Sequence, residues 1–470
     1  MVTKQQQTPP QPATPTKVLV SAGSSGDWSG GEGLLPGREA LGPIFLMAVT
    51  PPFVIVFYYI CTHMDGNVQA FAALIMQDGF LSTMYSIWPS PTDPHAWAMI
   101  LSFFAVQLLL MKIVPGKSFT ATLTAKGNTP VYTANGLQCY LITLAALLSL
   151  TYMGILHPAV VYDKFGNILA SLNVFAFFFC TMLLIKGHVA PSSTDSGTNG
   201  SIVQDFYWGM ELYPRILGWD VKMFTNCRAG MMFWAVGICC FAYKNAQLNN
   251  GVLQLGMAVN VSLQLIYITK FFYWEMGYMC SMDIQHDRAG YYLCWGCLVW
   301  VPSIYTSTSL YLTEHAPPLT PLQALTIFCC GFVMIFINYD SDHQRYVFRQ
   351  TKGQCSIWLS TSVPKHIVAT YSTTNTSATP NKVQQSLLLV DGYWKISRHF
   401  HYVPEVLASL CWSAPALDTA FFLPYVYVIY LSILLLDRAH RDDDRCLKKY
   451  GKYWEEYCHF VPYKIIPGVV

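Results

Sequence analysis

The chain has 470 residues, of which 53% are hydrophobic and 11% are charged, whereas soluble proteins carry about 25% charged residues. Its formal net charge is only +2, so no global charge would recruit nucleic acid. Together with a mean hydropathy of +0.34, this composition argues against a soluble protein and predicts an all-α, polytopic membrane protein. A transmembrane β-barrel is not expected, because its strands alternate over roughly ten residues and the apolar runs here are about twice that length.

The N-terminal segment, residues 1–38, is rich in Gln, Pro, Thr, Ser and Gly and lacks the apolar stretch of a signal peptide. Such a composition predicts a disordered cytosolic tail. The first apolar run, which begins near Leu41, is therefore expected to act as an uncleaved signal-anchor.

Apolar runs that could cross about 30 Å of hydrocarbon as helices recur along the chain and predict about ten transmembrane helices. The first should be kinked at Pro51-Pro52, the fifth is short and needs flanking residues, and the last pair is interrupted near Pro415 and Asp418. They are Leu41–His63, Trp97–Val114, Leu137–Ile155, Leu169–Ile185, Gly230–Tyr243, Val252–Trp274, Ala289–Leu312, Leu322–Tyr339 and a pair within Val403–Leu436. The polar stretches Pro191–Gly200 and Thr373–Lys382 predict flexible surface loops.

Lysine and arginine are in excess between Asp340 and Tyr402 and again after Leu436. A basic excess beside membrane spans marks the cytoplasmic side. Both regions are therefore predicted to face the cytosol, where NADPH is available.

The chain has fifteen cysteines, but many of them lie inside apolar runs, where cysteine acts as a small hydrophobic residue. The pair Cys294 and Cys297 is a lone C-x-x-C, and no second pair stands at zinc spacing. We therefore expect no metal site.

Three polar segments could carry chemistry. The first, Gly209–Met232, mixes charges with Pro and Gly before an apolar helix, and predicts an interfacial loop with snorkelling cations. The second lies between two apolar helices and holds titratable side chains that could deliver a proton at low dielectric. Its candidates are Tyr273, Glu275, Asp283, His286, Asp287 and Tyr305. A short loop whose ionic groups pair with one another explains the second segment equally well.

The third segment is C-terminal. Arg345 and Arg349 are four residues apart, hence on one helical face, where two guanidinium groups could grip phosphates. Trp394, Tyr402 and Tyr457 could border a flat ring, and Asp442 with the C-L-K-K-Y run could reach ribose and phosphate. No G-x-G-x-x-G follows a strand, so a Rossmann site is not expected. The positive-inside rule, by which lysine and arginine beside membrane spans anchor the protein on the cytoplasmic side, explains about half of this pattern.

The run D-R-A-H-R-D-D-D-R-C-L-K-K-Y-G-K-Y-W resembles the C-terminal signature of the sterol reductase family, and D-F-Y-W-G-M-E-L-Y-P-R resembles its other signature. This family includes Δ14- and Δ7-sterol reductases and the lamin B receptor. The runs G-N-T-P-V-Y-T-A-N-G-L, H-D-R-A-G-Y-Y-L-C-W-G-C-L-V-W-V-P-S-I-Y-T-S and S-R-H-F-H-Y-V-P-E are most similar to the Δ7-reducing branch in its plant or algal form. The resemblance covers residues 35–470.

The resemblance implies an endoplasmic-reticulum enzyme with ten helices, a sterol-binding transmembrane body over residues 39–337 and an NADPH-binding region over residues 338–470. His401 stands where animal members use Asn, and Asp437 stands where the signature prefers a base. Carried over by position, the NADPH contacts would be Arg345, Arg349, Leu389, Trp394, His401, Tyr402, Asp442, Cys446, Leu447, Lys448, Lys449, Tyr450 and Tyr457.

The resemblance further implies NADPH-dependent reduction of the C7–C8 double bond of a 5,7-diene sterol that reaches the enzyme from the bilayer. An unactivated alkene is not electrophilic, so an acid must protonate one carbon before hydride can reach the other; the six titratable residues above are not ranked. Other sterol-biosynthesis enzymes are candidate partners. The alternatives are a Δ14-sterol reductase and a non-catalytic membrane scaffold, although the lamin B receptor carries a long N-terminal reader domain that is not found here.

Overall fold

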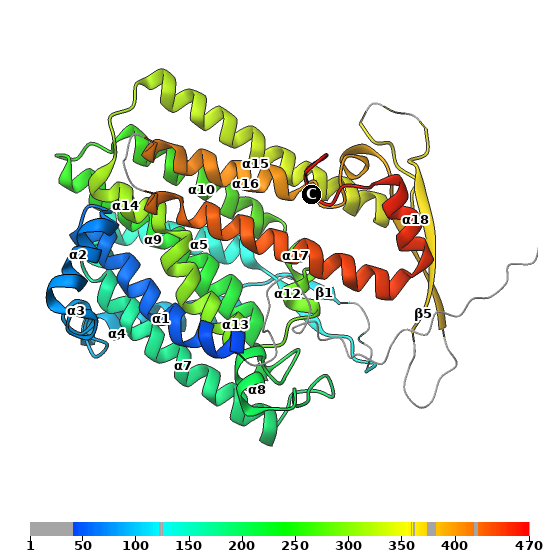
Figure 1. Cartoon of the computed structure of the whole chain (residues 1–470), viewed down its shortest axis with the longest axis horizontal. Coiled ribbons are helices and arrows are strands. Elements are labelled where there is room, and N and C mark those ends of the chain that lie inside the picture. Colours follow the sequence, from blue (N-terminus) through cyan, green and yellow to red (C-terminus); the bar gives the residue numbers. More distant parts are fainter. Residues whose placement is uncertain are drawn as a thin grey trace, which may run out of the picture.

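The computed structural model describes residues 41–121, 124, 126–358, 360, 362–373, 382–417 and 422–469. The predicted tail, residues 1–38, and Asp418 lie outside these ranges. Long helices run side by side through most of the molecule, and a β-hairpin with a short helix stands at one end (Figure 1). The C-terminus lies toward that end.

Six helical segments in the described ranges are long and apolar enough to cross a bilayer, so the chain is a multi-pass membrane protein. α9 is lengthened by a preceding π-helix, η1 (Met223–Gly230), as expected for the short fifth run. α1 is assigned as one helix through Pro51-Pro52. The six segments are α1 (Leu41–His63), α4 (Pro94–Ile113), α7 (Phe165–Val189), η1 with α9 (Met231–Leu248), α10 (Leu255–Tyr273) and α15 (Pro321–Gln350).

The other predicted spans form helices that are shorter or broken or, in the case of the 25-residue α17 (Val426–Tyr450), charged over the C-terminal half, so the number ten remains a prediction. The run Ala289–Leu312 is divided into three pieces, the middle of which contains Pro302. These spans comprise α5 (Gly136–Tyr152), α13 (Tyr291–Trp295), η2 (Gly296–Tyr305), α14 (Ser307–His315), α16 (Tyr402–Ser413), η4 (Ala414–Ala416), η5 (Leu423–Tyr425) and α17 (Val426–Tyr450). Short connecting helices are α2 (Val68–Asp78), α3 (Phe80–Ile87), α6 (Ala159–Asp163), α8 (Ile202–Trp208), α11 (Glu275–Met279), α12 (Met282–Gln285), η3 (Gly392–Lys395) and α18 (Lys452–Phe460).

The chain is mostly helical, as predicted, but three antiparallel pairs of strands that were not predicted are also present among the described residues. They are β1 (Lys117–Thr120) with β2 (Val131–Ala134), β3 (Arg215–Ile216) with β4 (Trp219–Asp220), and β5 (His366–Thr373) with β6 (Lys382–Leu389). The predicted loop Thr373–Lys382 connects β5 to β6, and only its two end residues are described. The β-branched residues and Tyr371 of H-I-V-A-T-Y-S-T favour a strand, a signal that the membrane-helix interpretation passed over.

The hydrophobic core has one large part and two small ones. The large part joins the membrane helices. A second part packs β5 and β6 against the end of α17 and against α18, and a third gathers Phe348, Ile357, Leu389 and Trp394. At about 1.5 Å per residue, the 30 residues of α15 extend well beyond a hydrocarbon core of about 30 Å. The polar C-terminal halves of α15 and α17 therefore project together toward the hairpin.

Candidate active site

Most of the segment Gly209–Met232 is buried, while residues 215–219 reach the surface, and its cations Lys222 and Arg228 do not snorkel as the sequence-based expectation had it. Lys222 and Arg228 are both fully buried. The Lys222 ammonium donates to the carbonyl oxygens of Asp283 (2.8 Å), Ile284 (2.5 Å) and Asp287 (2.8 Å). A lysine ammonium has three N–H donors, and here each of them is satisfied by a carbonyl oxygen. Lys222 thereby fixes the backbone of the segment after α11 that carries Asp283, His286 and Asp287, called the acid-rich loop below.

Glu275 is held by a buried clamp. Its Oε1 lies 2.6 Å from Arg228 Nη1, and its Oε2 accepts from the backbone N–H of Gly136 at 2.7 Å. Arg228 Nη2 also donates to Asn135 Oδ1 at 2.8 Å. Glu275 thereby satisfies one of the unpaired N–H groups at the start of α5, which the N-cap residue Asn135 leaves without a side-chain cap. Through these contacts the Glu275 side chain joins η1 to the start of α5.

Two glycines bring the segment before η1 against the acid-rich loop. A Cβ at Gly290 would lie 2.2 Å from Gly209 N, and one at Gly209 would lie 2.4 Å from the carbonyl carbon of Ala289. Gly209 also has a φ of 95°, in the left-handed region that favours glycine. Backbone therefore packs directly on backbone, and Ala289 N donates to Glu211 O at 3.0 Å.

The acids after α11 pair with arginines of α17 that are about 155 positions away in sequence. Arg438 Nη2 donates to both carboxylate oxygens of Asp283, at 2.6 and 2.8 Å. Arg441 Nη2 lies 2.5 Å from Asp287 Oδ1, and Arg445 contacts His286. These three arginines are separated by three and four residues, so they lie on one face of α17. The sequence suggested internal pairing within the loop, whereas the partners come from the C-terminal signature.

The two candidate tyrosines lie in different surroundings. Tyr273 ends α10 with 67% of its surface exposed. Tyr305 is half-buried among aromatic rings, with centroid distances of 5.1 Å to Trp234 and 4.7 Å to Tyr427. Its hydroxyl interacts with that of Tyr430, and the charge of Arg438 acts on it.

Arg438 also acts electrostatically on Tyr402 and Tyr278, whose hydroxyl is buried without a hydrogen-bond partner among the described residues. Arg438 therefore contacts the acid-rich loop through Asp283, and its charge acts on Tyr305 and on the predicted cofactor residue Tyr402.

Arg345 and Arg349 lie on the projecting half of α15. The Arg345 guanidinium stands 3.9 Å from the centre of the Trp394 ring and 3.2 Å from Asp342. Trp394 is fixed by a hydrogen bond from its Nε1 to Ser341 O, at 2.9 Å. Arg349, one turn later, is exposed and close enough to Asp442 to be affected by its charge.

Two histidines precede α16. His399 stacks on Tyr402 with ring centroids 5.1 Å apart, and its Nε2 is 3.9 Å from Asp442 Oδ2. His401 contacts both Trp394 and Tyr402. Burial lowers the pKa of His399 to about 4 and lowers the pKa of His401 well below its usual value, so both rings are neutral at cytosolic pH.

His399 Nε2 and His401 Nδ1 have no hydrogen-bond partner among the described residues. Buried polar atoms without partners are costly and point to a missing ligand group or water. His399 was missed by the sequence analysis, although it stands in the quoted run S-R-H-F-H-Y.

The remaining predicted cofactor residues do not share one face. Leu389 lies in the small core with Trp394, while Cys446, Tyr450 and Tyr457 pack against the β5–β6 hairpin. Leu447, Lys448 and Lys449 are exposed, and Lys449 lies over the ring of Tyr371. Arg345, Trp394, His401 and Tyr402 form one contacting group, and the charges of Asp442 and Arg438 act on Tyr402.

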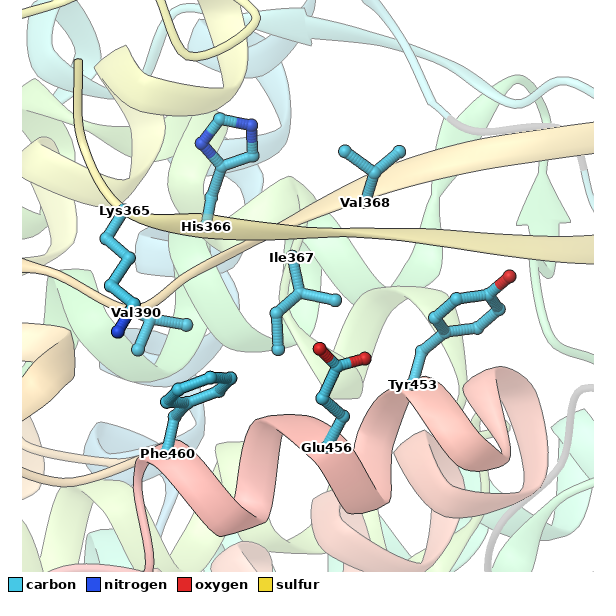
Figure 2. Close-up of a pocket in the computed structure, with 8 residues that line it drawn as sticks. All are labelled: Lys365, His366, Ile367, Val368, Val390, Tyr453, Glu456 and Phe460. Atoms are coloured by element: carbon cyan, nitrogen blue, oxygen red, sulfur yellow. The ribbon is translucent and has the colours of Figure 1, made fainter. Parts of the chain in front are cut away.

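An open groove of about 330 Å³ lies between β5 and α18, outside this group (Figure 2). Its floor is apolar, with Ile367 between the two elements, and Lys365 lies over the ring of Phe460 at 4.3 Å. None of the predicted cofactor residues lines it.

Comparison with known proteins completes the description. Residues 40–470 match the ergosterol biosynthesis ERG4/ERG24 family. The chain is 50% identical over 425 residues to a 7-dehydrocholesterol reductase of Arabidopsis thaliana, which covers 90% of this chain and 96% of the relative. It is 32% identical to the 7-dehydrocholesterol reductase of Danio rerio (92% and 91% covered). It is 30% identical to a Δ14-sterol reductase of Methylotuvimicrobium alcaliphilum (91% and 94% covered). The chain therefore belongs to the ergosterol biosynthesis ERG4/ERG24 family of sterol reductases, as its two signature motifs predict.

Proposed function

We propose that this chain reduces the C7–C8 double bond of a 5,7-diene sterol, with NADPH as the reductant. The relative that shares half of its residues is named for that activity. The observation that supports the proposal is that the charge of Arg438 acts on both Tyr305 and Tyr402. Tyr305 belongs to the aromatic group, and Tyr402 contacts His401, which packs on Trp394 and, through it, Arg345. The group around Tyr305 offers a sterol a proton and an apolar surface. The group of Arg345, Trp394, His401 and Tyr402 offers a dinucleotide cations and flat rings.

The C-terminal group suits a phosphorylated dinucleotide. Arg345 and Arg349 would hold phosphate groups, because guanidinium groups bind phosphates with paired hydrogen bonds. The unpartnered nitrogens of the neutral His399 and His401 would hydrogen-bond ribose hydroxyls or an amide, and Tyr402 would border a flat ring. When bound, NADPH supplies the hydride.

Proton delivery falls to Tyr305 in this proposal. Glu275, Asp283 and Asp287 are each bound to an arginine, so that service as the acid would require breaking a buried ion pair, which is costly. Tyr273 is largely exposed at the end of α10. Tyr305 makes no ion pair among the described residues and is half-buried beside the rings of Trp234 and Tyr427, where its hydroxyl interacts with that of Tyr430. This hydroxyl is the proton donor that we propose.

Sterol profiling of yeast that expresses the full chain tests the activity. Loss of Δ7 unsaturation from the 5,7-diene sterols of the host is the expected result. Loss of Δ14 unsaturation in a host that accumulates Δ14 sterols would establish the alternative supported by the Methylotuvimicrobium relative. A profile identical to that of the empty vector, with the protein present in membranes, would favour the scaffold.

Arg349→Ala should raise the apparent KM for NADPH far more than the KM for sterol. A charge-assisted hydrogen bond contributes roughly 1.5–3 kcal/mol, or about ten- to a hundredfold in affinity. Initial rates in microsomes at varied NADPH measure the effect. Lys117→Ala, which removes an exposed cation of β1, is the control and should leave both constants unchanged. An unchanged KM for NADPH in the Arg349 variant would contradict phosphate binding and would indicate that Arg349 only anchors its helix at the membrane surface.

We also propose that the chain resides in the endoplasmic reticulum with its C-terminus in the cytosol, because lysine and arginine are in excess after Leu436. Protease added to sealed microsomes should remove a tag placed after Val470. A tag that is protected until detergent is added would reverse the topology and contradict cytosolic cofactor binding.

A further inference from the structure

One face of α15 holds part of the group that is proposed to bind NADPH. Ser341 O accepts a hydrogen bond from Trp394 Nε1 at 2.9 Å, and the Arg345 guanidinium lies 3.9 Å from the centre of the Trp394 ring. Asn338 is three positions before Ser341 and seven before Arg345, so the three residues share this face of the helix. Its side chain is only 2% exposed. A buried amide needs hydrogen-bond partners, and those of Asn338 include a member of the group.

Asn338 holds the chain at His401. Its Nδ2 donates to His401 O at 2.8 Å. The same carbonyl also accepts a helical hydrogen bond from Glu405 N, but this bond is longer, at 3.4 Å. Because N–H···O bonds in proteins are usually about 2.9–3.0 Å long, the side chain of Asn338 provides the better of the two bonds. The start of α16 is thereby fixed against α15.

Asn338 also links two charged side chains. Lys270 of α10 donates to its Oδ1, and Glu405 Oε2 accepts from its Nδ2 at 3.3 Å. Glu405 Oε1 accepts from the Tyr267 hydroxyl at 2.8 Å, and the Lys270 ammonium lies 4.5 Å from the centre of the Tyr267 ring. An amide can accept from an ammonium and donate to a carboxylate at the same time. This network therefore orients the Asn338 amide so that its Nδ2 reaches His401 O.

The position of the His401 backbone determines where the His401 ring lies. The ring contacts Trp394 and Tyr402, with centroids 5.2 and 4.3 Å away, and its Nδ1 is buried without a hydrogen-bond partner among the described residues. A group that binds a ligand is effective only when the structure around it holds it in place. Since Asn338 and Arg345 belong to one helix, the bond to His401 O ties the ring to the guanidinium that would hold phosphate.

We infer that Asn338 is a positioning residue of the NADPH site, which holds the His401 backbone so that the ring can hydrogen-bond the cofactor. The inference rests on the proposed function for the identity of the cofactor. Asn338 acts through His401, and the network of Lys270, Glu405 and Tyr267 keeps its amide oriented.

The test is an exchange variant of the full-length protein in detergent, Asn338→Asp with Glu405→Gln. The carboxylate at position 338 can accept from Lys270 and from the amide at position 405, so the network stays satisfied and the net charge does not change. The donor to His401 O is lost. The Kd for NADPH, measured by calorimetry, should rise about three- to tenfold, the effect of one neutral hydrogen bond. The unfolding temperature should stay near that of the unchanged protein.

Asn245→Asp is the matched control. Asn245 is fully buried in α9, and its Nδ2 donates to the carbonyl oxygens of Leu312 and Thr313 in α14, at 3.3 and 3.0 Å. The change removes the same kind of donor from backbone carbonyls that belong to neither α15 nor α16. It should lower the unfolding temperature and leave the Kd for NADPH unchanged.

A second comparison shows whether Asn338 acts through His401. In protein that carries His401→Ala, the exchange should have no further effect on the Kd for NADPH, because the ring that it displaces is absent. If the exchange variant does not accumulate, Asn338→Ser takes its place, since it removes the amide without adding a charge, and the same rise is expected.

Three results would overturn the inference: an unchanged Kd for NADPH in the Asn338 variant, an equal rise in Asn245→Asp, or a rise of the same size in the presence and absence of the His401 ring. None of these measurements depends on turnover. If the unchanged protein binds NADPH but reduces no sterol, the proposed reaction fails and the Kd values still decide the role of Asn338. If it binds no NADPH, both proposals fail.

Discussion

Tyr305→Phe should lower turnover by about a hundred- to ten-thousandfold, the usual contribution of a positioned general acid. The change removes only the hydroxyl. The ring can keep its contacts with Trp234 and Tyr427, so folding and binding of both substrates should be retained. Single-turnover reduction of 7-dehydrocholesterol by purified protein, with NADPH binding measured beside it, separates loss of chemistry from loss of binding.

Two tyrosines serve as controls. Tyr427→Phe removes a hydroxyl from a neighbouring ring that is 2% exposed, and Tyr273→Phe removes the other candidate, which is 67% exposed. Neither change should reduce turnover by more than a small factor. If Tyr273→Phe abolished turnover and Tyr305→Phe did not, the assignment of the two residues would be reversed.

Glu275→Gln should destabilise the protein by about 3–5 kcal/mol, because it leaves the buried charge of Arg228 without its partner. The amide still accepts from Gly136 N, so most of the loss comes from the missing charge. Thermal unfolding in detergent and the amount of protein recovered from membranes measure the effect. Removing both charges, as in Glu275→Gln with Arg228→Gln, should recover part of the stability.

Asp163→Asn makes the same chemical change in an exposed pair. Asp163 lies 2.7 Å from Lys244, with 48% of its side chain exposed, and such a pair contributes only about 0–1 kcal/mol. Its unfolding temperature should stay close to that of the unchanged protein. If Glu275→Gln were equally stable but inactive, Glu275 would be the acid and the clamp would be secondary.

Helices were predictable from the sequence where composition alone determines them. An uncharged apolar run cannot remain extended in a bilayer, because its backbone groups must bond within the segment; α1 begins and ends where its run does. The β5–β6 hairpin was not predicted, although the β-branched residues of β5 favour a strand. Its packing against α17 and α18 could not have been predicted in the same way, because those contacts join positions about 80 residues apart.

The candidate site was predictable in its residue types but not in its pairing. Arg345 and Arg349 could be placed on one face from their spacing alone. The partners of Asp283 and Asp287 could not be found in this way, because Arg438 and Arg441 reach them only after α17 has packed against the acid-rich loop. Lys222 looked like a snorkelling cation, since a sequence does not reveal three carbonyl oxygens that converge from a loop 61 residues away.

The contact between Gly209 and Gly290 limits how the two segments that carry them can differ from one relative to another. With no side chain between the two backbones, neither segment can accept a bulkier residue unless the other moves. Because Lys222 and Arg228 also bind groups within residues 275–290, the segments 205–228 and 275–290 should vary together between relatives. A chimaera that takes residues 205–228 from a distant relative should accumulate in membranes only when residues 275–290 come from the same donor.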